Sequence, residues 1–253
     1  MGEGVDEFRP GDRAAYGGYP GSYAQIRCIP AHRLVRLPDA ISTEQAAAMM
    51  LQGMTARYLL HGCYRVKSGD RILMHAAAGG VGSILCQWAN HLGAEVIGTV
   101  GSAEKAAIAE KNGCHHIILY NEVDFSEQVR TITSGRGVDV VYDGVGQATF
   151  MKSLDCLCPM GTMVSFGQAS GSVPPLDIGV LAAKGSLFLT RPSLMTYTAE
   201  RQDLLDHARD LFTVVEQGAV NIAVSRTYPL KEAARAQQDL EGRRTMGSVV
   251  LIP

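Results

Sequence analysis

Short apolar runs alternate with segments of helical periodicity through the middle of the chain. The runs are rich in Val and Ile, which is typical of strands buried on both faces of a sheet. Between them, apolar residues recur at every third or fourth position, which predicts amphipathic helices. Strands are expected from 71 to a glycine-rich turn that begins at 76, and at 95–100, 116–119, 138–142, 162–166 and 187–190; helices are expected at 83–91, 103–111, 125–133 and 148–156. This alternation predicts an α/β fold built on a doubly wound parallel sheet.

The first strand leads directly into a turn of small residues, Ala76 to Gly82, and then into a helix. Gly79 and Gly80 allow the backbone to approach a pyrophosphate, and Gly82 allows the helix to pack close to its strand. The helix N-terminus adds N–H groups and the positive end of the helix dipole. The usual dinucleotide motif has glycine where Ala77 stands, so the pattern alone is also typical of a turn without a ligand. The surrounding strand-helix-strand unit favours a dinucleotide phosphate site.

The end of the second strand decides between NADH and NADPH. An acidic residue at this point normally binds the ribose hydroxyls of NAD, but here the strand ends at Val100. Ser102 and Lys105 follow, and a hydroxyl with a lysine can bind a 2′-phosphate that a carboxylate repels. Glu104 lies between them in the first helical turn, where a carboxylate also suits the helix dipole. We expect NADPH, with a solvated helix lysine as the alternative role of Lys105.

Both ends of the chain differ from this middle region. Pro and Gly break the N-terminal part into short segments at 10–13, 16–21 and 22–28, which indicates part of an antiparallel barrel or sandwich. This part is too short to close a domain alone. We expect 221–226 and 248–252 to return to it, so that the sheet region is inserted between its pieces.

The composition is that of a globular protein, with 46% apolar residues, 19% charged residues and a net charge of −2. The near-neutral balance argues against a nucleic-acid partner, because proteins that bind nucleic acids normally carry a basic surface. No apolar run reaches the length of a membrane span, and the first residues lack the pattern of a signal peptide. We therefore expect a cytoplasmic protein without membrane contact.

Six cysteines are spread over the chain without the paired spacing of a structural zinc site. His115 and His116 are equally weak as metal ligands, because neighbours on a strand point to opposite faces. The sequence therefore predicts reduced thiols and no metal site.

Several blocks of sequence, in this order along the chain, resemble one known family. They are Pro-Gly-Asp-Arg at 10–13, Gly-Met-Thr-Ala at 53–56, the turn at 76–82, Val-Tyr-Asp-Gly-Val-Gly at 141–146, Val-Ser-Phe-Gly at 164–167, Thr-Arg-Pro-Ser-Leu at 190–194 and Gly-Ser-Val-Val-Leu-Ile-Pro at 247–253. They resemble the zinc-independent NADPH:quinone oxidoreductases, also called the zeta-crystallin group, of the medium-chain dehydrogenase/reductase superfamily. The resemblance covers essentially the whole chain.

The resemblance implies a partial GroES-like β-barrel catalytic domain at 1–50 and 222–253, and a Rossmann NADPH-binding domain at 51–221. It also implies a homodimer formed partly through the sheet edge near the last Rossmann strand. Roughly seventy residues that precede the turn at 10–13 in the family, with an Asn and a Tyr near the nicotinamide, have no counterpart in this sequence. We therefore expect part of the catalytic wall to be missing from this chain.

The resemblance also implies a 2′-phosphate pocket at Lys105, Tyr120 and Arg243. The nicotinamide is expected where the carboxyl ends of the parallel strands open onto the cofactor. The expected cofactor-binding residues are Thr55, Ala78, Gly79, Gly80, Val81, Gly82, Ser102, Lys105, Tyr120, Gly144, Val145, Gly146, Phe166, Gly167, Pro192, Ser193, Leu194 and Arg243. Tyr142 is expected to pack and Asp143 to cap the next element, rather than to form an acid and base pair. No side chain is assigned as catalytic.

The implied activity is hydride transfer from NADPH to a quinone or a related electron-poor small molecule, with solvent protonating the reduced quinone. Two alternatives stay open. A medium-chain enoyl or alkenal reductase shares every cofactor motif, and a chain without part of its catalytic wall could bind NADPH without turnover.

Overall fold

A computed structural model describes residues 2–242 and 244–253. The chain forms two compact units: one spans Tyr58–Ser193, and the other combines the residues up to Arg57 with those from Leu194 onward. The two ends of the chain therefore lie in one unit. The unit boundaries differ from the predicted domain boundaries at 50/51 and 221/222, and the division into catalytic and cofactor domains stays a prediction.

The unit of residues 58–193 is built on a six-stranded parallel sheet with the order β5-β4-β3-β6-β7-β8. The strands are β3 Arg71–His75, β4 Glu95–Val100, β5 His116–Leu119, β6 Val138–Asp143, β7 Leu157–Ser165 and β8 Phe188–Thr190. In the centre, the register pairs Leu73 with Ile97 and with Val141, and all three side chains are buried. Continuous burial of the central strands explains why they lack an apolar-polar alternation.

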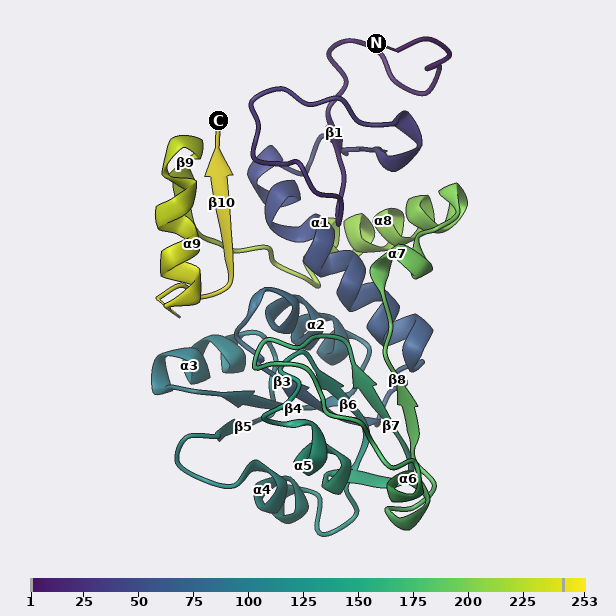
Figure 1. The fold of residues 1–253 in the computed structure, drawn as a ribbon, viewed down its shortest axis with the longest axis vertical. Helices are drawn as coiled ribbons and strands as arrows, with labels where there is room; N and C mark the ends of the chain where they lie inside the picture. Colours follow the sequence, from purple (N-terminus) through teal and green to yellow (C-terminus); the bar gives the residue numbers. More distant parts are fainter. Residues whose placement is uncertain (1, 243) are drawn as a thin grey trace. The chain divides into compact units, whose positions relative to one another are not determined.

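Helices cover both faces of this sheet. In Figure 1, α2 and α3 lie on one face and α4 and α5 on the other. The helices are α2 Gly80–His91, α3 Ala103–Lys111, α4 Phe125–Ile132, α5 Phe150–Asp155 and α6 Gly179–Ala183, and a π-helical segment, Leu59–Cys63, precedes them. The predicted doubly wound α/β fold is confirmed.

Most predicted elements agree with the structure, and two differ in an informative way. Helix α2 begins at Gly80, three residues earlier than expected, so the last glycines of the turn form its first helical turn. Strand β7 begins at Leu157, five residues earlier than expected, because Val138 pairs with Leu157 before a register irregularity. Met160 lies within β7 in the left-handed region, at φ 61°.

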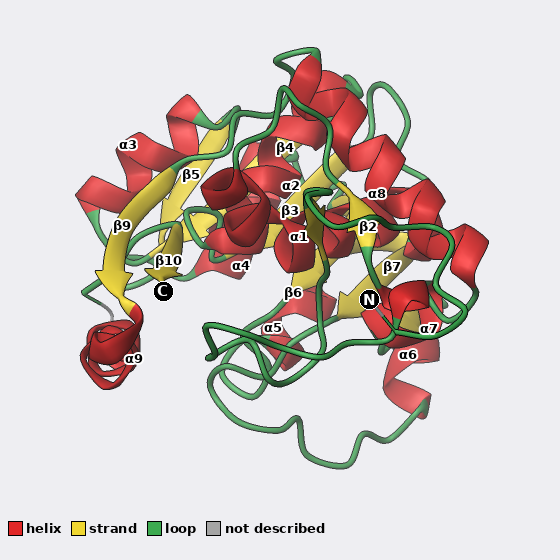
Figure 2. Ribbon diagram, turned by 90° about the horizontal axis from the view of Figure 1, so that it is seen from above, coloured by secondary structure: helices red, strands yellow, loops and turns green. Residues whose placement is uncertain are grey.

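The other unit contains two small sheets and several helices. Its elements are β1 Ala14–Ala15, η1 Ala31–Arg33, β2 Val35–Arg36, α1 Thr43–Tyr58, α7 Leu194–Tyr197, α8 Arg201–Glu216, β9 Val224–Pro229, η3 Leu230–Glu232, α9 Ala233–Glu241 and β10 Ser248–Ile252. Strands β1 and β2 are antiparallel, but each has only two residues and both lie outside the segments expected at 10–13, 16–21 and 22–28, which contain no strand. Strands β9 and β10 lie side by side (Figure 2) but run parallel, which corrects the expected antiparallel arrangement. Their parallel direction follows from the crossover helix α9 that connects them.

Two ion-pair contacts hold α1 and α8 together. The Arg57 guanidinium donates from Nε and Nη2 to Oδ2 of Asp210, at 3.0 and 2.9 Å. His207, on the same face of α8, lies 3.3 Å from Nη1 of Arg57. In the described part of the chain, no helix is long and apolar enough to cross a membrane.

Candidate cofactor site

The carboxyl ends of the six parallel strands lie along one edge of the sheet. The strand order reverses between β3 and β6, because the chain proceeds outward from β3 through β4 to β5 and then returns to β6. Ligands of open α/β sheets bind outside the carboxyl ends of the strands at such a switch point. The turn at 76–82 follows β3 and the loop at 144–146 follows β6, so both predicted segments lie at this point.

The turn after β3 is so tight that its glycines are required. Ala76 adopts a left-handed conformation at φ 54°, and its carbonyl accepts from the Gly79 amide at 2.8 Å. A Cβ atom on Gly82 would lie 2.4 Å from the Ala76 oxygen and 2.8 Å from the Ala77 backbone. A Cβ on Gly98 of β4 would lie 2.8 Å from the Ala77 Cβ. The absence of side chains at Gly82 and Gly98 lets α2 and β4 pack close to the turn. Ala77, which stands where the usual motif has glycine, is buried.

The N-terminus of α2 presents backbone donors. Gly79 is the N-cap residue, and among the described residues no side chain caps this helix. The first amides of a helix have no partner within it, so those of Gly80, Val81 and Gly82 are oriented for an anion. Ser102 caps α3 and Asp124 caps α4, whereas α5, α8 and α9 also lack a side-chain cap.

Tyr120, Gly101 and Ser102 come together beyond β4 and β5. Tyr120 is 44% exposed. Its hydroxyl oxygen lies so close to Gly101 that a Cβ atom on Gly101 would be only 2.6 Å away from it. The Ser102 hydroxyl accepts from the Lys105 amide at 3.4 Å. Asn121 donates to the Gly101 carbonyl at 2.8 Å. The sequence reasoning missed Asn121, whose position directly after Tyr120 was the only local signal.

The loops after β6 and β7 pack against each other. A Cβ on Gly167 would lie 2.5 Å from the Gly144 oxygen, and one on Gly144 would lie 2.9 Å from the Phe166 ring. Gly146 has φ 90°, a conformation that favours glycine. The Ser170 amide also donates to the Val145 carbonyl at 2.8 Å. The predicted residues Gly144 to Gly146, Phe166 and Gly167 therefore form one compact wall.

Asp143 and Tyr142 have structural partners. Asp143 is fully buried, and one of its carboxylate oxygens accepts from the amides of Val145 and Gly146 at 2.7 and 3.0 Å. The other accepts from the Thr149 hydroxyl at 2.7 Å. Tyr142 donates to the Leu59 carbonyl at 3.1 Å, and burial raises its pKa well above the ordinary value. Both side chains therefore have internal partners, and the absence of an acid and base role stays a prediction.

The remaining predicted residues are distributed as follows. Pro192 is buried and Ser193 exposed, after β8. Thr55 is buried in α1 and Leu194 begins α7, and both belong to the other unit. Arg243 lies outside the described residues. Within the unit of residues 58–193, the predicted residues at 78–82, 144–146, 166–167 and 192–193, together with Ser102 and Tyr120, thus follow the carboxyl ends of strands of one sheet.

A buried histidine is the second residue that the sequence reasoning missed. His75 ends β3, directly before the glycine turn, and both ring nitrogens have hydroxyl partners. A histidine within an apolar strand gives no signal of its own, because its partners Thr99 and Ser153 are remote in the sequence.

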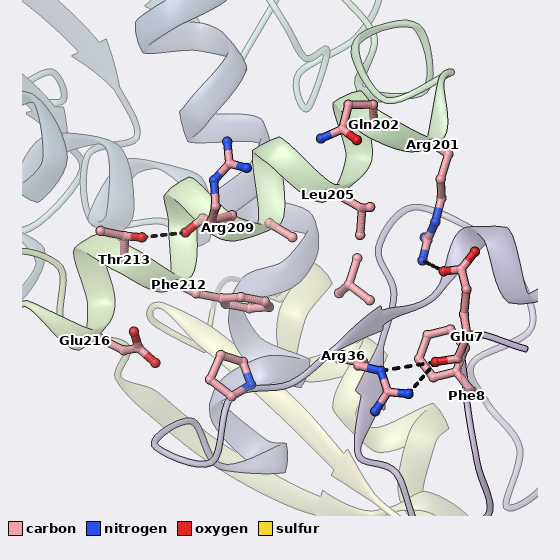
Figure 3. Close-up of a pocket in the computed structure, with 13 residues that line it drawn as sticks. Glu7, Phe8, Arg36, Arg201, Gln202, Leu205, Arg209, Phe212, Thr213 and Glu216 are labelled. Carbon is pink, nitrogen blue, oxygen red and sulfur yellow. Dashed lines mark hydrogen bonds and ion pairs between the residues drawn. The ribbon is translucent and has the colours of Figure 1, made fainter.

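The unit formed by the chain ends contains a cavity of about 450 Å³ (Figure 3), beneath α8. Its arginines are engaged within the protein. Arg201 binds the Glu7 carboxylate, and Arg36 donates from Nε to the Glu7 carbonyl at 3.1 Å. Nε of Arg201 is buried without a hydrogen-bond partner in the described part of the chain, so this cavity keeps a side-chain donor open, whereas the sheet edge offers backbone donors.

The fold and the open glycine turn at its switch point define a dinucleotide-binding oxidoreductase. A family model described as zinc-binding dehydrogenase matches residues 80–209. The chain belongs to the zinc-independent quinone oxidoreductases of the medium-chain dehydrogenase/reductase superfamily.

Three comparisons support this membership. The chain is 48% identical to a 2-haloacrylate reductase of a Burkholderia species, over all of this chain and 77% of that protein. It is 48% identical to quinone oxidoreductase 1 of Escherichia coli, over all of this chain and 78% of that protein. The crystal structure of Escherichia coli quinone oxidoreductase complexed with NADPH matches with a TM-score of 0.97 and 47% identity, over all of this chain and 78% of that one.

The matching family model is named for zinc-binding dehydrogenases, whose zinc centre requires a cluster of metal-ligating side chains. No group of three or more His, Cys, Asp or Glu side chains within residues 2–242 and 244–253 could hold a metal ion. The described residues therefore do not fit a zinc centre.

Proposed function

We propose that this chain binds NADPH and reduces quinones by hydride transfer. The observation that carries the proposal is the contact of α2 with the turn after β3. Gly82 leaves no room for a side chain, and the first amides of α2 face outward from an uncapped N-terminus. The NADPH complex of the similar Escherichia coli enzyme supports the choice of cofactor.

The residues at the sheet edge fit an NADP dinucleotide. The amides of Gly80, Val81 and Gly82, together with the backbone at Ala78 and Gly79, would bind the pyrophosphate. Ser102, Lys105 and Tyr120 would bind the 2′-phosphate, because the region after β4 offers a hydroxyl, an ammonium and a phenol. Arg243 remains a proposed fourth member of this pocket.

The nicotinamide side of the proposed site is formed by backbone and apolar groups. Gly144, Val145, Gly146, Phe166 and Gly167 would line it, with Pro192, Ser193, Leu194 and Thr55 as further proposed residues. When bound, NADPH supplies a hydride from its nicotinamide C4. The residues of the chain position the ring and exclude water. Since Asp143 and Tyr142 are engaged in internal hydrogen bonds, solvent protonates the reduced quinone in this proposal.

A second candidate is reduction of an electron-poor alkene. The chain is 48% identical both to a 2-haloacrylate reductase and to quinone oxidoreductase 1, which supports this second candidate as much as the first. NADPH oxidation followed with ortho-quinones, para-quinones, 2-haloacrylates and 2-alkenals separates the candidates. Turnover of quinones alone supports the first, turnover of the alkenes alone supports the second, and binding without turnover indicates an NADPH-binding chain.

Cofactor preference is tested by titrating NADPH and NADH while following the thermal midpoint. NADPH should stabilise the protein more strongly than NADH does. Lys105→Ala should raise the Kd for NADPH about tenfold and leave the Kd for NADH nearly unchanged. Lys111→Ala, at the other end of α3, is the matched control and should leave both titrations unchanged. Equal stabilisation of the wild type by NADH and NADPH would contradict the 2′-phosphate pocket.

We also propose a cytoplasmic homodimer. Phe188 on the edge strand β8 is 62% exposed, which supports pairing of this edge with a second copy. All six cysteines, each within the described part of the chain, are free thiols, which supports a reducing compartment. Light scattering should give the mass of a dimer for the wild type and of a monomer for Phe188→Asp; a monomeric wild type contradicts the dimer.

A further inference from the structure

The last residue of β3, His75, is 1% exposed and lies between two hydroxyl groups. Its Nδ1 is 2.9 Å from Oγ1 of Thr99 on β4, and its Nε2 is 2.9 Å from Oγ of Ser153 on α5. The Phe125 ring contacts the imidazole edge to face, with centroids 4.9 Å apart. The imidazole therefore connects β3 with one neighbouring strand and with a helix on the sheet.

The hydrogen-bond directions follow from Ser153. Its hydroxyl donates to the Thr149 carbonyl at 2.9 Å, so Oγ accepts from Nε2–H of His75. The other nitrogen, Nδ1, then accepts from the Thr99 hydroxyl. Both polar atoms of the neutral ring are satisfied. Burial lowers the pKa of His75 and keeps it in this neutral form, against the opposing charge of Asp143.

The network continues from α5 to the loop after β6. The Thr149 hydroxyl donates to Oδ2 of Asp143 at 2.7 Å, and Oδ1 of Asp143 accepts from the amides of Val145 and Gly146. At the other end, Ala76 follows His75 directly and starts the glycine turn at φ 54°. The chain of hydrogen bonds, buried at His75 and Asp143 and partly exposed at Thr149, thus reaches from the last residue before the turn to the loop after β6.

We propose that His75 is a positioning residue of the cofactor crevice, which holds the phosphate turn and the 144–146 loop in register through Thr99, Ser153 and Asp143. The inference rests on the proposed function, since it assigns these two segments to the pyrophosphate and the nicotinamide. His75 itself touches no reacting atom. An apolar replacement would remove the acceptor of the Thr99 hydroxyl and the donor to Ser153 Oγ, which keeps only its hydrogen bond to the Thr149 carbonyl, and the protein relieves this loss by moving the segments that carry these groups.

The test compares two replacements with a buried histidine elsewhere. His75→Leu removes both hydrogen bonds, His75→Gln retains one donor and one acceptor, and His207→Leu removes a histidine that is 4% exposed in α8. We expect the Kd for NADPH, measured by nicotinamide fluorescence, to rise about tenfold in His75→Leu. His75→Gln should recover it to within about threefold of the wild type. His207→Leu should lower the thermal midpoint without changing the Kd.

Steady-state kinetics give the second readout. In His75→Leu the KM for NADPH should rise more than kcat falls, because the residue acts through the turn and not on the reacting atoms. Ser153→Ala, which cuts the same network with a smaller change in volume, should raise the Kd by at least about threefold and serves if His75→Leu does not fold.

Four outcomes would overturn the inference. An unchanged Kd in both His75→Leu and Ser153→Ala contradicts it, as does an equal rise of Kd in His207→Leu. A fall in kcat with unchanged KM in His75→Leu assigns the residue to the chemistry instead of to positioning. Absence of NADPH binding by the wild type would instead overturn the proposed function, and the inference with it.

Discussion

The charged and hydrogen-bonding groups at the two edges of the parallel sheet find their partners in different ways. At the amino edge, side chains pair with one another. Arg71 at the start of β3 donates from Nε to Glu95 at 2.7 Å, and Glu95 lies 2.9 Å from Nε2 of His116. Asp139 accepts from the Arg71 amide at 2.8 Å and from Arg136 at 2.6 Å. This edge is satisfied by its own residues.

At the carboxyl edge, small residues and backbone groups take the place of these ion pairs. The α2 amides face outward from an uncapped helix, and the buried network of His75 and Asp143 supports the segments from behind. An edge that needs a ligand to complete its hydrogen bonds is a binding edge, and an edge that completes them internally is a structural one. Substitutions at the two edges should therefore differ in kind: both change stability, but only the carboxyl edge should change cofactor affinity.

The sharpest test replaces one glycine at each edge. A Cβ on Gly82 would lie 2.4 Å from the Ala76 oxygen, and a Cβ on Gly137, before β6, would lie 2.7 Å from the Cys158 amide nitrogen. Each alanine should cost about 1–3 kcal/mol in unfolding free energy, because the backbone must move. Gly82→Ala should in addition weaken NADPH binding by about a hundredfold, whereas Gly137→Ala should retain the wild-type Kd. Denaturant unfolding and fluorescence titration measure the two effects, and an equal loss of affinity in both variants breaks the distinction between the edges.

A pair of aspartates gives the next largest contrast. Asp143→Asn removes an acceptor from the Thr149 hydroxyl in a fully buried site, and should cost about 1–3 kcal/mol in unfolding free energy. It should also raise the Kd for NADPH, because the 144–146 loop loses part of its support. Asp139→Asn weakens the partly exposed pair with Arg136 and should cost about 1 kcal/mol or less, with unchanged Kd. A rise of Kd in Asp139→Asn alone would contradict the assignment of the two edges.

The same contrast explains what the sequence could predict. Strands β4 and β5 and helix α3 have the predicted bounds, because their apolar runs and flanking turns are local signals. The glycine turn was found for the same reason. His75 and Asn121 were missed because their roles depend on Thr99, Ser153 and Gly101, which only the folded sheet brings near. The parallel pairing of β9 with β10 depends on a crossover through α9, which the short-segment pattern did not reveal.

The amino edge should contribute to the acid sensitivity of the unit. Burial alone raises the pKa of Glu95, but the hydrogen bonds from Arg71 and His116 outweigh it and lower the pKa below the ordinary value. The stabilisation from this lowered pKa is complete above about pH 4.3, the unfolded value, and is lost as the pH falls through the lower folded pKa. Because Glu95 is about one third exposed, Glu95→Gln should lower the unfolding free energy at neutral pH by only about 0.5–1 kcal/mol and flatten this acid limb. Unfolding curves between acidic and neutral pH measure the limb, and an unchanged limb in Glu95→Gln contradicts this role.

The smallest expected effect lies within the carboxyl edge itself. The Asn121 side chain donates to the Gly101 carbonyl and thereby fixes the backbone of Gly101, which contacts the Tyr120 hydroxyl. The bond is exposed to solvent, so Asn121→Ala should leave the unfolding free energy within about 0.5 kcal/mol of the wild type. Because Tyr120 belongs to the proposed 2′-phosphate pocket, the Kd for NADPH should nevertheless rise about two- to threefold, while that for NADH stays constant. Parallel titrations with the two dinucleotides resolve this difference. An equal change for both cofactors would mean that Asn121 acts on the whole edge, and that the 2′-phosphate pocket has no separate support from this residue.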